Sequence, residues 1–318
     1  MERVGEIDAF RGFVIVLMVF FTLTQMLSSN LPDILKHNQD WELHFGDFVL
    51  PMFLFASGMS LVFYVRKHNA KGRREFILDI LERFGKLAII ALMLSVYTSG
   101  EIFGMDVIML SALLFLGTMV VFRLSQPAIL ALMAAICLLY YALLQIGTMP
   151  VSMESDLGGY PAAAYYFTVM LSGMLFGKEL ERKNESGMKR LAIIFLALFA
   201  GSALLMPIDK MSASPSFMML SVLISLGFFS ATALAMKAGK LHLFQWLGRT
   251  PLRYWILMFL LFIIPLMYYT YFRGQAFPME IDWHIGIAVS AGVMFMLGAV
   301  SWIIDRAHEK IATDMAQK

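Results

Sequence analysis

Long uninterrupted runs of apolar residues alternate with short polar connections along the chain. A helix needs about 20 mostly apolar residues to cross a bilayer. The runs lack the period-two alternation of membrane β-strands. The pattern therefore predicts an all-α polytopic integral membrane protein that forms one transmembrane domain over residues 1–318. We expect about ten membrane-spanning helices, at 12–29, 47–64, 85–99, 104–122, 127–146, 161–177, 190–207, 216–236, 251–272 and 284–304.

Composition agrees with this class. Hydrophobic residues make up 59% of the chain and charged residues only 15%, whereas a soluble domain carries about 25% charged residues. There is no long basic run, so we expect no nucleic-acid partner. The single cysteine, Cys137, excludes a disulfide within the chain. The first residues lack the pattern of a removable signal peptide, so we expect the first apolar run to stay as a membrane helix.

The positive charges predict an orientation. If the N-terminus is cytoplasmic and ten helices alternate, 22 of the 25 Lys and Arg residues fall on the cytoplasmic side. The other three are Lys36, Lys210 and Arg273. Cytoplasmic connections of membrane proteins are enriched in Lys and Arg. We therefore expect both termini to be cytoplasmic, and we expect the membrane to be a bacterial inner membrane.

Several finer features of the helices can also be predicted. The basic connection 65–84 has apolar residues at helical spacing, which predicts an amphipathic interfacial helix whose basic residues face anionic headgroups or a phosphate-bearing ligand. Small residues allow helices to approach closely, so we expect close contacts at Gly58, Gly173 and Gly177. Proline interrupts the helical hydrogen-bond ladder, so we expect kinks at Pro51 and Pro265.

Charged residues near membrane depth are expensive and often functional. Asp8 and Arg11 are three residues apart and share a helix face; they either anchor a phosphate-rich ligand or a gate, or simply fix the helix end. Arg249 and Arg253 are four apart at the start of a late helix, where Arg and a helix N-terminus favour phosphate or carboxylate. The alternative is ordinary positive flanking. Asp106 either contacts a substrate or caps a helix.

The first extracytoplasmic loop carries the best candidates for acid–base chemistry. It contains His37, Trp41 and His44 and ends at Asp47. Histidine suits proton transfer near neutral pH, and a carboxylate such as Asp47 could orient it. The alternative is an interfacial loop with a belt Trp, solvated histidines and Asp47 as a helix cap. A metal site has no obvious third ligand, so we expect none.

Four segments resemble a known family. IDAFRGF, LMVFF, the loop with His and Trp, and GDFVLPMFLFASGMSL are similar to the heparan-α-glucosaminide N-acetyltransferase family of the transmembrane acyltransferase superfamily. The segments LGRTPLRYWIL and DVIMLSALLFL resemble later parts of that family. The chain departs from the family pattern in three places. Trp41 follows His37 by four residues instead of three, Thr22 replaces an asparagine, and Met258 replaces a histidine.

The resemblance implies a reaction and a set of roles. An acyl group would pass from acetyl-CoA or another acyl-CoA on the cytoplasmic side to a sugar amine or hydroxyl on the other side. The essential histidine of the family stands ten residues before the Asp of the DFVLP-like motif, which assigns that role to His37, with His44 as the positional rival. Asp47 would orient His37. The remaining roles are acceptor binding by Asp106, Trp41 and His44, and donor binding by Arg3, Asp8, Arg11, Arg249 and Arg253.

Two other function classes fit parts of the pattern. A transporter or flippase of a small solute or lipid-linked sugar would also have many helices and few intramembrane charges, although we find no inverted repeat. An inactive binding scaffold is compatible with the departures from the family. Under the acyltransferase interpretation the partners are membrane lipids, acyl-CoA and a sugar or glycan acceptor, and a homodimer is compatible with the sequence.

Overall fold

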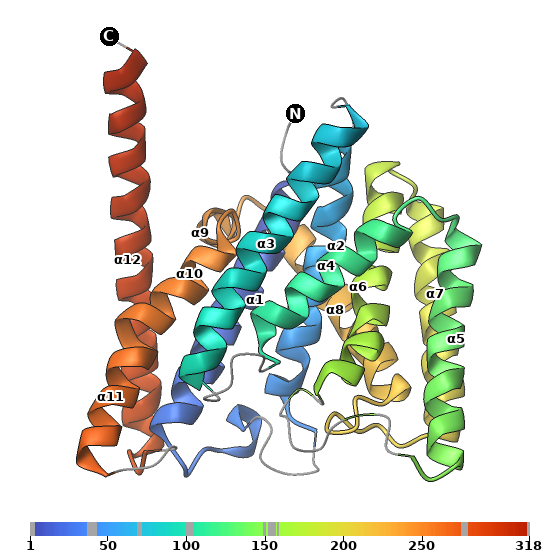
Figure 1. Ribbon diagram of the computed structural model, residues 1–318, viewed down its shortest axis with the longest axis horizontal. Helices are drawn as coiled ribbons and strands as arrows, with labels where there is room; N and C mark the ends of the chain where they lie inside the picture. The colour runs from blue at the N-terminus through green and yellow to red at the C-terminus, as the bar shows by residue number, and fades with distance from the viewer. Residues whose placement is uncertain are drawn as a thin grey trace.

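The structure is a bundle of helices (Figure 1). It is a computed structural model that describes residues 4–36, 43–68, 72–98, 105–148, 151, 157, 159–274 and 279–316. Within these residues the only β-structure is an isolated bridge between Ser28 and Glu280. The elements are α1 (Gly5–Leu27), η1 (Asp33–Leu35), η2 (Phe45–Phe48), α2 (Val49–His68), α3 (Arg73–Thr98), α4 (Val107–Val121), α5 (Gln126–Gln145), α6 (Gly159–Glu181), α7 (Glu185–Leu205), α8 (Pro215–Lys237), α9 (His242–Leu247), α10 (Pro251–Met258), η3 (Phe259–Ile263), α11 (Ile264–Arg273) and α12 (Trp283–Ala316).

The all-α class is confirmed, and the chain is an integral membrane protein. Among the described residues, seven helices are long and apolar enough to cross a membrane. The helices at the third, fourth and sixth expected spans are α3, α4 and α6. They do not reach this threshold for different reasons. The helix α4 has only 15 residues, charged residues lie within α3, and the tyrosine, proline and small polar residues of α6 lower its hydropathy. The count of ten spans therefore stays a prediction.

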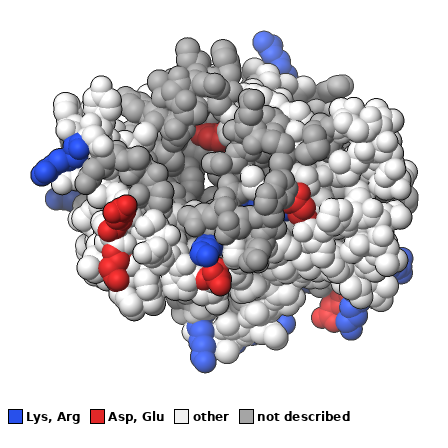
Figure 2. Space-filling view, turned by 90° about the horizontal axis from the view of Figure 1, so that it is seen from below, with Lys and Arg blue, Asp and Glu red and all other residues white. Residues whose placement is uncertain are grey.

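Successive long helices run in opposite directions, and both ends of the chain lie at the same end of the bundle (Figure 1). The connections after α2, α4, α6 and α8 lie toward this end, which we call the terminal end. The connections after α1, α3, α5 and α7 lie toward the opposite end, which we call the loop end. Figure 2 looks onto the loop end, where the described charged side chains of both signs lie scattered among uncharged residues.

The basic connection 65–84 differs from the expectation. Its residues from Arg73 onward are helical, as predicted, but they belong to α3, which continues without interruption to Thr98. A separate interfacial helix is therefore wrong for this segment. The physical reason is that no proline lies between Arg73 and Thr98 to end the helix, and an isolated Gly85 weakens a helix without breaking it.

The centre of the bundle is formed by α1 and α2, whose apolar windows are 67% and 72% buried, whereas those of α5, α7 and α12 are only 11–17% buried. Glycines let α2 and α6 cross at close range, as predicted. A Cβ atom at Gly58 would lie 2.1 Å from the Met170 carbonyl oxygen, and one at Gly173 would lie 2.1 Å from that of Phe55. The backbones therefore touch where these glycines stand.

The two prolines behave differently. Pro51 lies in the first turn of α2, where a missing N–H removes no helical hydrogen bond, and the helix continues unbroken to His68. The helix is therefore not interrupted at Pro51, and the kink expected there stays a prediction. Pro265 follows the π-helical segment Phe259–Ile263, which separates α10 from α11. The helical ladder is thus disturbed next to Pro265, as expected.

Candidate functional site

A cavity of about 680 Å³ lies among α1, α2, α3, α4 and α10. Most of its wall is apolar, with hydroxyl groups from serines of α2 and α4. Its lining extends from the start of α10 to Val107 and Ile108 at the start of α4. Five cationic side chains also line it: Arg11, Arg83, Lys86, Arg249 and Arg253. Three of these were predicted as donor-binding residues, so residues 242 positions apart in sequence share one cavity.

Arg11 ties three elements together at the terminal end. Its guanidinium bonds Asp8 at 2.9 Å, the Gly248 carbonyl oxygen at 2.7 Å and the Ser60 hydroxyl at 3.2 Å. Asp8 therefore fixes Arg11 and does not itself line the cavity. The contacts of Asp8 and Arg11 fit the interpretation that the pair fixes the end of α1. Arg11 also lines the cavity.

The contact between α1 and the segment after α9 depends on two glycines. A Cβ atom at Gly12 would lie 1.8 Å from the Phe244 carbonyl oxygen, and one at Gly248 would lie 1.7 Å from the Asp8 carbonyl oxygen. Any larger residue would push the two backbones apart. This close approach is what brings the Gly248 carbonyl oxygen within reach of Arg11, and it places Arg249 beside α1.

Arg249 and Arg253 lie on either side of the first residue of α10, and they have different partners. Arg253 forms an ion pair with Asp305 of α12 and a 3.2 Å hydrogen bond with the Ser301 hydroxyl. Asp305 also accepts a 3.0 Å hydrogen bond from the Trp246 indole. The exposed Arg249 side chain has no hydrogen bond or ion pair among the residues that the structure describes. Arg249 is therefore available to a ligand.

Two cations on α3 were not among the predicted site residues. The Arg83 guanidinium lies 4.8 Å from the ring centre of Tyr64 and 5.2 Å from that of Phe115, and Lys86 pairs with Glu82 one turn earlier. The sequence placed Arg83 and Lys86 in a basic segment expected to face anionic headgroups or a phosphate-bearing ligand, but it did not single out these two residues. Their spacing of three residues, which places both on one helix face, was the signal that could have singled them out.

Asp47 lies buried at the loop end, where it contacts the His44 backbone and the Lys210 side chain. It belongs to η2, immediately before α2, and is only 2% exposed. Its carboxylate accepts a 2.8 Å hydrogen bond from the His44 backbone N–H and lies 3.2 Å from the Lys210 ammonium. Lys210 is itself only 8% exposed. Sequence reasoning missed Lys210, because its loop lies 163 positions further along the chain.

Of the two candidate histidines, the structure describes His44. His44 is 7% exposed, and its Nε2 atom has no hydrogen-bond partner among the described residues. His37 and Trp41 lie outside the described residues, as does Arg3 at the N-terminus. Their predicted roles in catalysis, acceptor binding and donor binding therefore stay predictions.

A short turn at the loop end precedes His37 in the sequence. Lys36 lies 2.8 Å from the Asp33 carboxylate across η1. The hydrogen bond and the positive charge of Lys36 lower the pKa of Asp33 below its ordinary value. A turn closed by this pair therefore leads directly into the segment that carries His37.

Asp106 is the N-cap of α4. Its side chain accepts a 2.6 Å hydrogen bond from the Met109 backbone N–H, as expected for a capping aspartate. Val107 and Ile108, which follow it, line the cavity. Asp106 therefore has a structural role and also stands next to the end of the cavity that is remote from Arg249.

The comparisons with known proteins give one finding. A family model described as heparan-alpha-glucosaminide N-acetyltransferase, catalytic, matches residues 3–208 of the 318-residue chain. The match covers Arg11, the candidate histidines, Asp47 and Asp106, and it ends before Lys210, Arg249 and Arg253. No curated protein matches the chain significantly.

Proposed function

Because the chain belongs to the heparan-alpha-glucosaminide N-acetyltransferase catalytic family, we propose that it transfers an acyl group from cytoplasmic acyl-CoA to an amino-sugar or glycan acceptor across the membrane. Family membership indicates a membrane acetyltransferase; the donor, the sidedness and the acceptor are parts of this proposal. The observation that carries it is the cavity lined by five cationic residues within a bundle that is otherwise mostly apolar.

The cationic residues of the cavity suit the phosphates of the donor. Acyl-CoA carries its negative charge on the nucleotide part, and guanidinium groups bind phosphate oxygens through charge-assisted hydrogen bonds. Arg249 would meet a phosphate first, because it is exposed and has no described partner. Arg11 and Arg253 would contribute positive potential while keeping their partners in the protein. In this arrangement the terminal end is the cytoplasmic end.

The thin pantetheine arm would then extend through the bundle toward the loop end. Ser60, which bonds Arg11, follows Asp47 by 13 positions along η2 and α2. At a rise of 1.5 Å per residue the cations and Asp47 are about 20 Å apart. The serines and apolar residues of the cavity wall would enclose the arm without competing strongly for its amides.

His37 would act on the acceptor at the loop end. It would take a proton from the acceptor amine or hydroxyl as that group attacks the thioester carbonyl. The new C–N or C–O bond forms, the C–S bond breaks, and the CoA sulfur leaves as a thiolate that takes up a proton. In the two-step alternative, the imidazole first accepts the acyl group from the thioester and then passes it to the acceptor. Asp47 would position the loop through its bond to His44.

Purified protein incubated with labelled acetyl-CoA and glucosamine-containing acceptors tests the proposal. We expect labelled acceptor with the wild type and with His44→Ala, and none with His37→Ala. Retained activity in His37→Ala together with loss in His44→Ala would reject the assignment to His37 and transfer the role to the buried His44. Thermal stabilisation by CoA separates this proposal from a transporter or flippase, which has no reason to bind CoA. Absence of any stabilisation by CoA would reject the acyltransferase.

A further inference from the structure

A second and larger cavity lies among α1, α9, α10 and α12, and the proposed acyl transfer uses only Arg249 of its lining. Its volume is about 1200 Å³, which exceeds the usual range of about 300–1000 Å³ for small-molecule sites. It opens beside α12, the peripheral helix at one side of the bundle in Figure 1. Its size and its place at the edge of the bundle suit a ligand that enters from the membrane.

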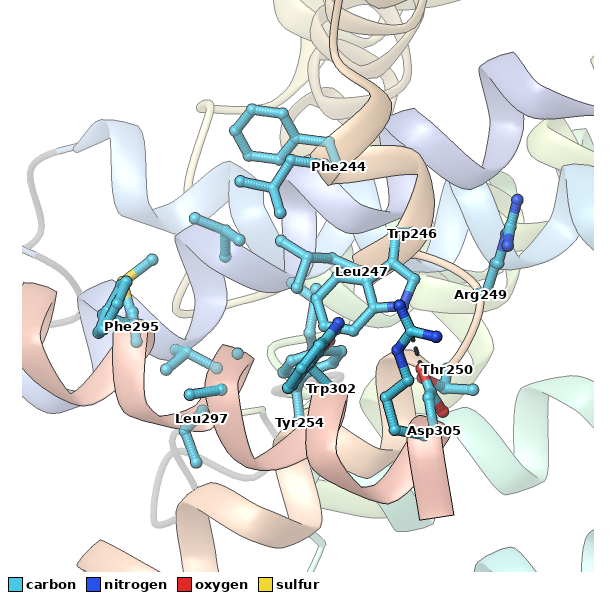
Figure 3. A pocket seen from close by; sticks show the side chains of 18 of the residues that line it. Phe244, Trp246, Leu247, Arg249, Thr250, Tyr254, Phe295, Leu297, Trp302 and Asp305 are labelled. Carbon is cyan, nitrogen blue, oxygen red and sulfur yellow. Dashed lines mark hydrogen bonds between the residues drawn. The ribbon is translucent and has the colours of Figure 1, made fainter. Parts of the chain in front are cut away.

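The wall of this cavity changes in character along the bundle axis. Figure 3 shows Phe295 and Leu297 at one end and Trp246, Asp305 and Arg249 at the other. The apolar part lies toward the middle of α12 and continues over Val19 of α1. The polar part lies toward the terminal end of the bundle. Such a gradient matches a molecule with one polar end and long apolar chains.

Two tryptophans mark the depth at which the wall becomes polar. Trp246 of α9 and Trp302 of α12 both line the cavity. Tryptophan is enriched at the level of the lipid headgroups, because its ring is amphipathic. The charged residues of the lining that belong to α12 follow Trp302 toward the terminal end: Asp305, Arg306, His308 and Glu309.

Most charges at the polar end are compensated within the protein. Asp305 pairs with Arg253 and accepts a hydrogen bond from Trp246. Arg306 lies 3.5 Å from Glu309 and over the Trp302 ring. Arg249 is the lining arginine for which the described residues supply no partner. The polar end thus presents an uncompensated guanidinium, which calls for an anion.

We propose that this cavity binds one membrane phospholipid, with its phosphate at Arg249 and its acyl chains along Val16, Met294 and the exposed Phe295. Basic pockets between membrane helices on the cytoplasmic side bind phosphate-bearing lipid headgroups. The ordering of the wall, with arginine beyond the tryptophans and apolar residues below them, is that of a lipid in the bilayer. This inference does not depend on the acyl-transfer reaction.

Two glycines of α12 provide a matched pair for the test. Gly298 lines the cavity and Gly292 does not. A Cβ atom added at either position meets no atom within 4 Å. Gly298→Trp should therefore fill the cavity without disturbing the helix, and Gly292→Trp should place the same side chain elsewhere on the same helix.

The experiment is native mass spectrometry of the purified full-length protein titrated with phosphatidylglycerol in detergent. We expect the wild type and Gly292→Trp to retain one lipid, and Gly298→Trp to bind it at least ten-fold more weakly. Equal binding by both variants would overturn the proposal, because the lipid would then be general annular lipid. A wild-type dimer that Gly298→Trp dissociates, without loss of a lipid, would also overturn it in favour of a second copy of the chain.

A second measurement covers the case in which Gly298→Trp does not fold. Wild-type protein in phosphatidylglycerol nanodiscs is labelled with a phospholipid that carries a photoreactive group on one acyl chain. We expect labelled peptides from the segment around Phe295 and Leu297. Labelling spread evenly over the peripheral helices α5, α7 and α12 would overturn the proposal.

Discussion

Replacing Lys210 with methionine should destabilise the loop end of the bundle severely. The Lys210 ammonium lies 3.2 Å from the Asp47 carboxylate, and the two residues are only 8% and 2% exposed. Methionine has similar length and no charge, so the variant removes the counter-ion while the cavity stays filled. Removal of one partner from a buried ion pair costs about 3–5 kcal/mol, because the remaining charge loses its counter-ion.

The matched control also removes the Asp47 charge, which Lys210→Met leaves without its counter-ion. Asp47→Asn keeps a group that can accept the 2.8 Å hydrogen bond from the His44 N–H. In the double variant Asp47→Asn/Lys210→Met neither member of this ion pair carries a charge. The cost of the double variant should therefore be well below the sum of the two single costs, and the difference measures the coupling between the two side chains.

The assay is thermal unfolding of the purified proteins in one detergent at one lipid concentration. A destabilisation of about 1 kcal/mol lowers Tm by about 2 °C in a domain of this size or somewhat smaller, so Lys210→Met should lower Tm by about 6–10 °C. A Tm within about 2 °C of the wild type would refute the reasoning. It would mean that solvent or another group neutralises Asp47 in the absence of Lys210.

Three further predictions follow from the same geometry. Gly173→Leu should unfold or strongly destabilise the bundle, because its Cβ would lie 2.1 Å from a backbone carbonyl oxygen. Gly201→Leu should not, because a Cβ atom there meets no atom within 4 Å, and expression yield and Tm compare the two variants. Arg249→Ala should weaken CoA binding about ten- to hundred-fold with an unchanged Tm, because it removes a charge-assisted hydrogen bond worth about 1.5–3 kcal/mol. Arg273→Ala at the loop end should leave CoA binding unchanged, and calorimetric titration checks both. Asp106→Asn should keep the Tm, because Asn caps as well as Asp, and should raise KM for the acceptor if the carboxylate binds it; an unchanged KM would leave Asp106 with its capping role alone.

The helices could be predicted because apolar runs of the required length have few other structures available in a membrane. Their boundaries were harder to predict for a physical reason. The run at 12–29 was placed too late, since α1 begins at Gly5 and includes Asp8 and Arg11. Hydropathy excludes such residues from a span, but their charges are paired and packed against the segment after α9. The first half of α3 was expected as a separate helix, because its charged residues interrupt the apolar run.

The residues of the candidate site could be predicted only where charge, spacing or resemblance marks a residue in the sequence itself. Arg11, Arg249 and Arg253 could be selected from charge, spacing and resemblance, and the structure brings them to one cavity. Lys210 had no such signal, because a lysine in a short loop resembles any solvated lysine. Its importance arises only when the connection between α7 and α8 reaches the start of α2. That contact depends on tertiary packing, which no local pattern encodes.

Two of the arginines that line the first cavity are paired within the protein, and a third is exposed and can meet a ligand. This difference explains how a charged site can exist inside an apolar bundle. An unpaired charge at low dielectric is costly. Arg11 and Arg253 avoid this cost through partners in the protein, and these same partners hold α1, α2 and α12 in place around the cavity. Arg249 avoids it because it is exposed at the terminal end. A ligand phosphate can therefore reach Arg249 without breaking a native ion pair, while the paired arginines add attraction from fixed positions. Because Arg249 also lines the second cavity, a lipid phosphate and a soluble phosphate ligand would meet at the same guanidinium.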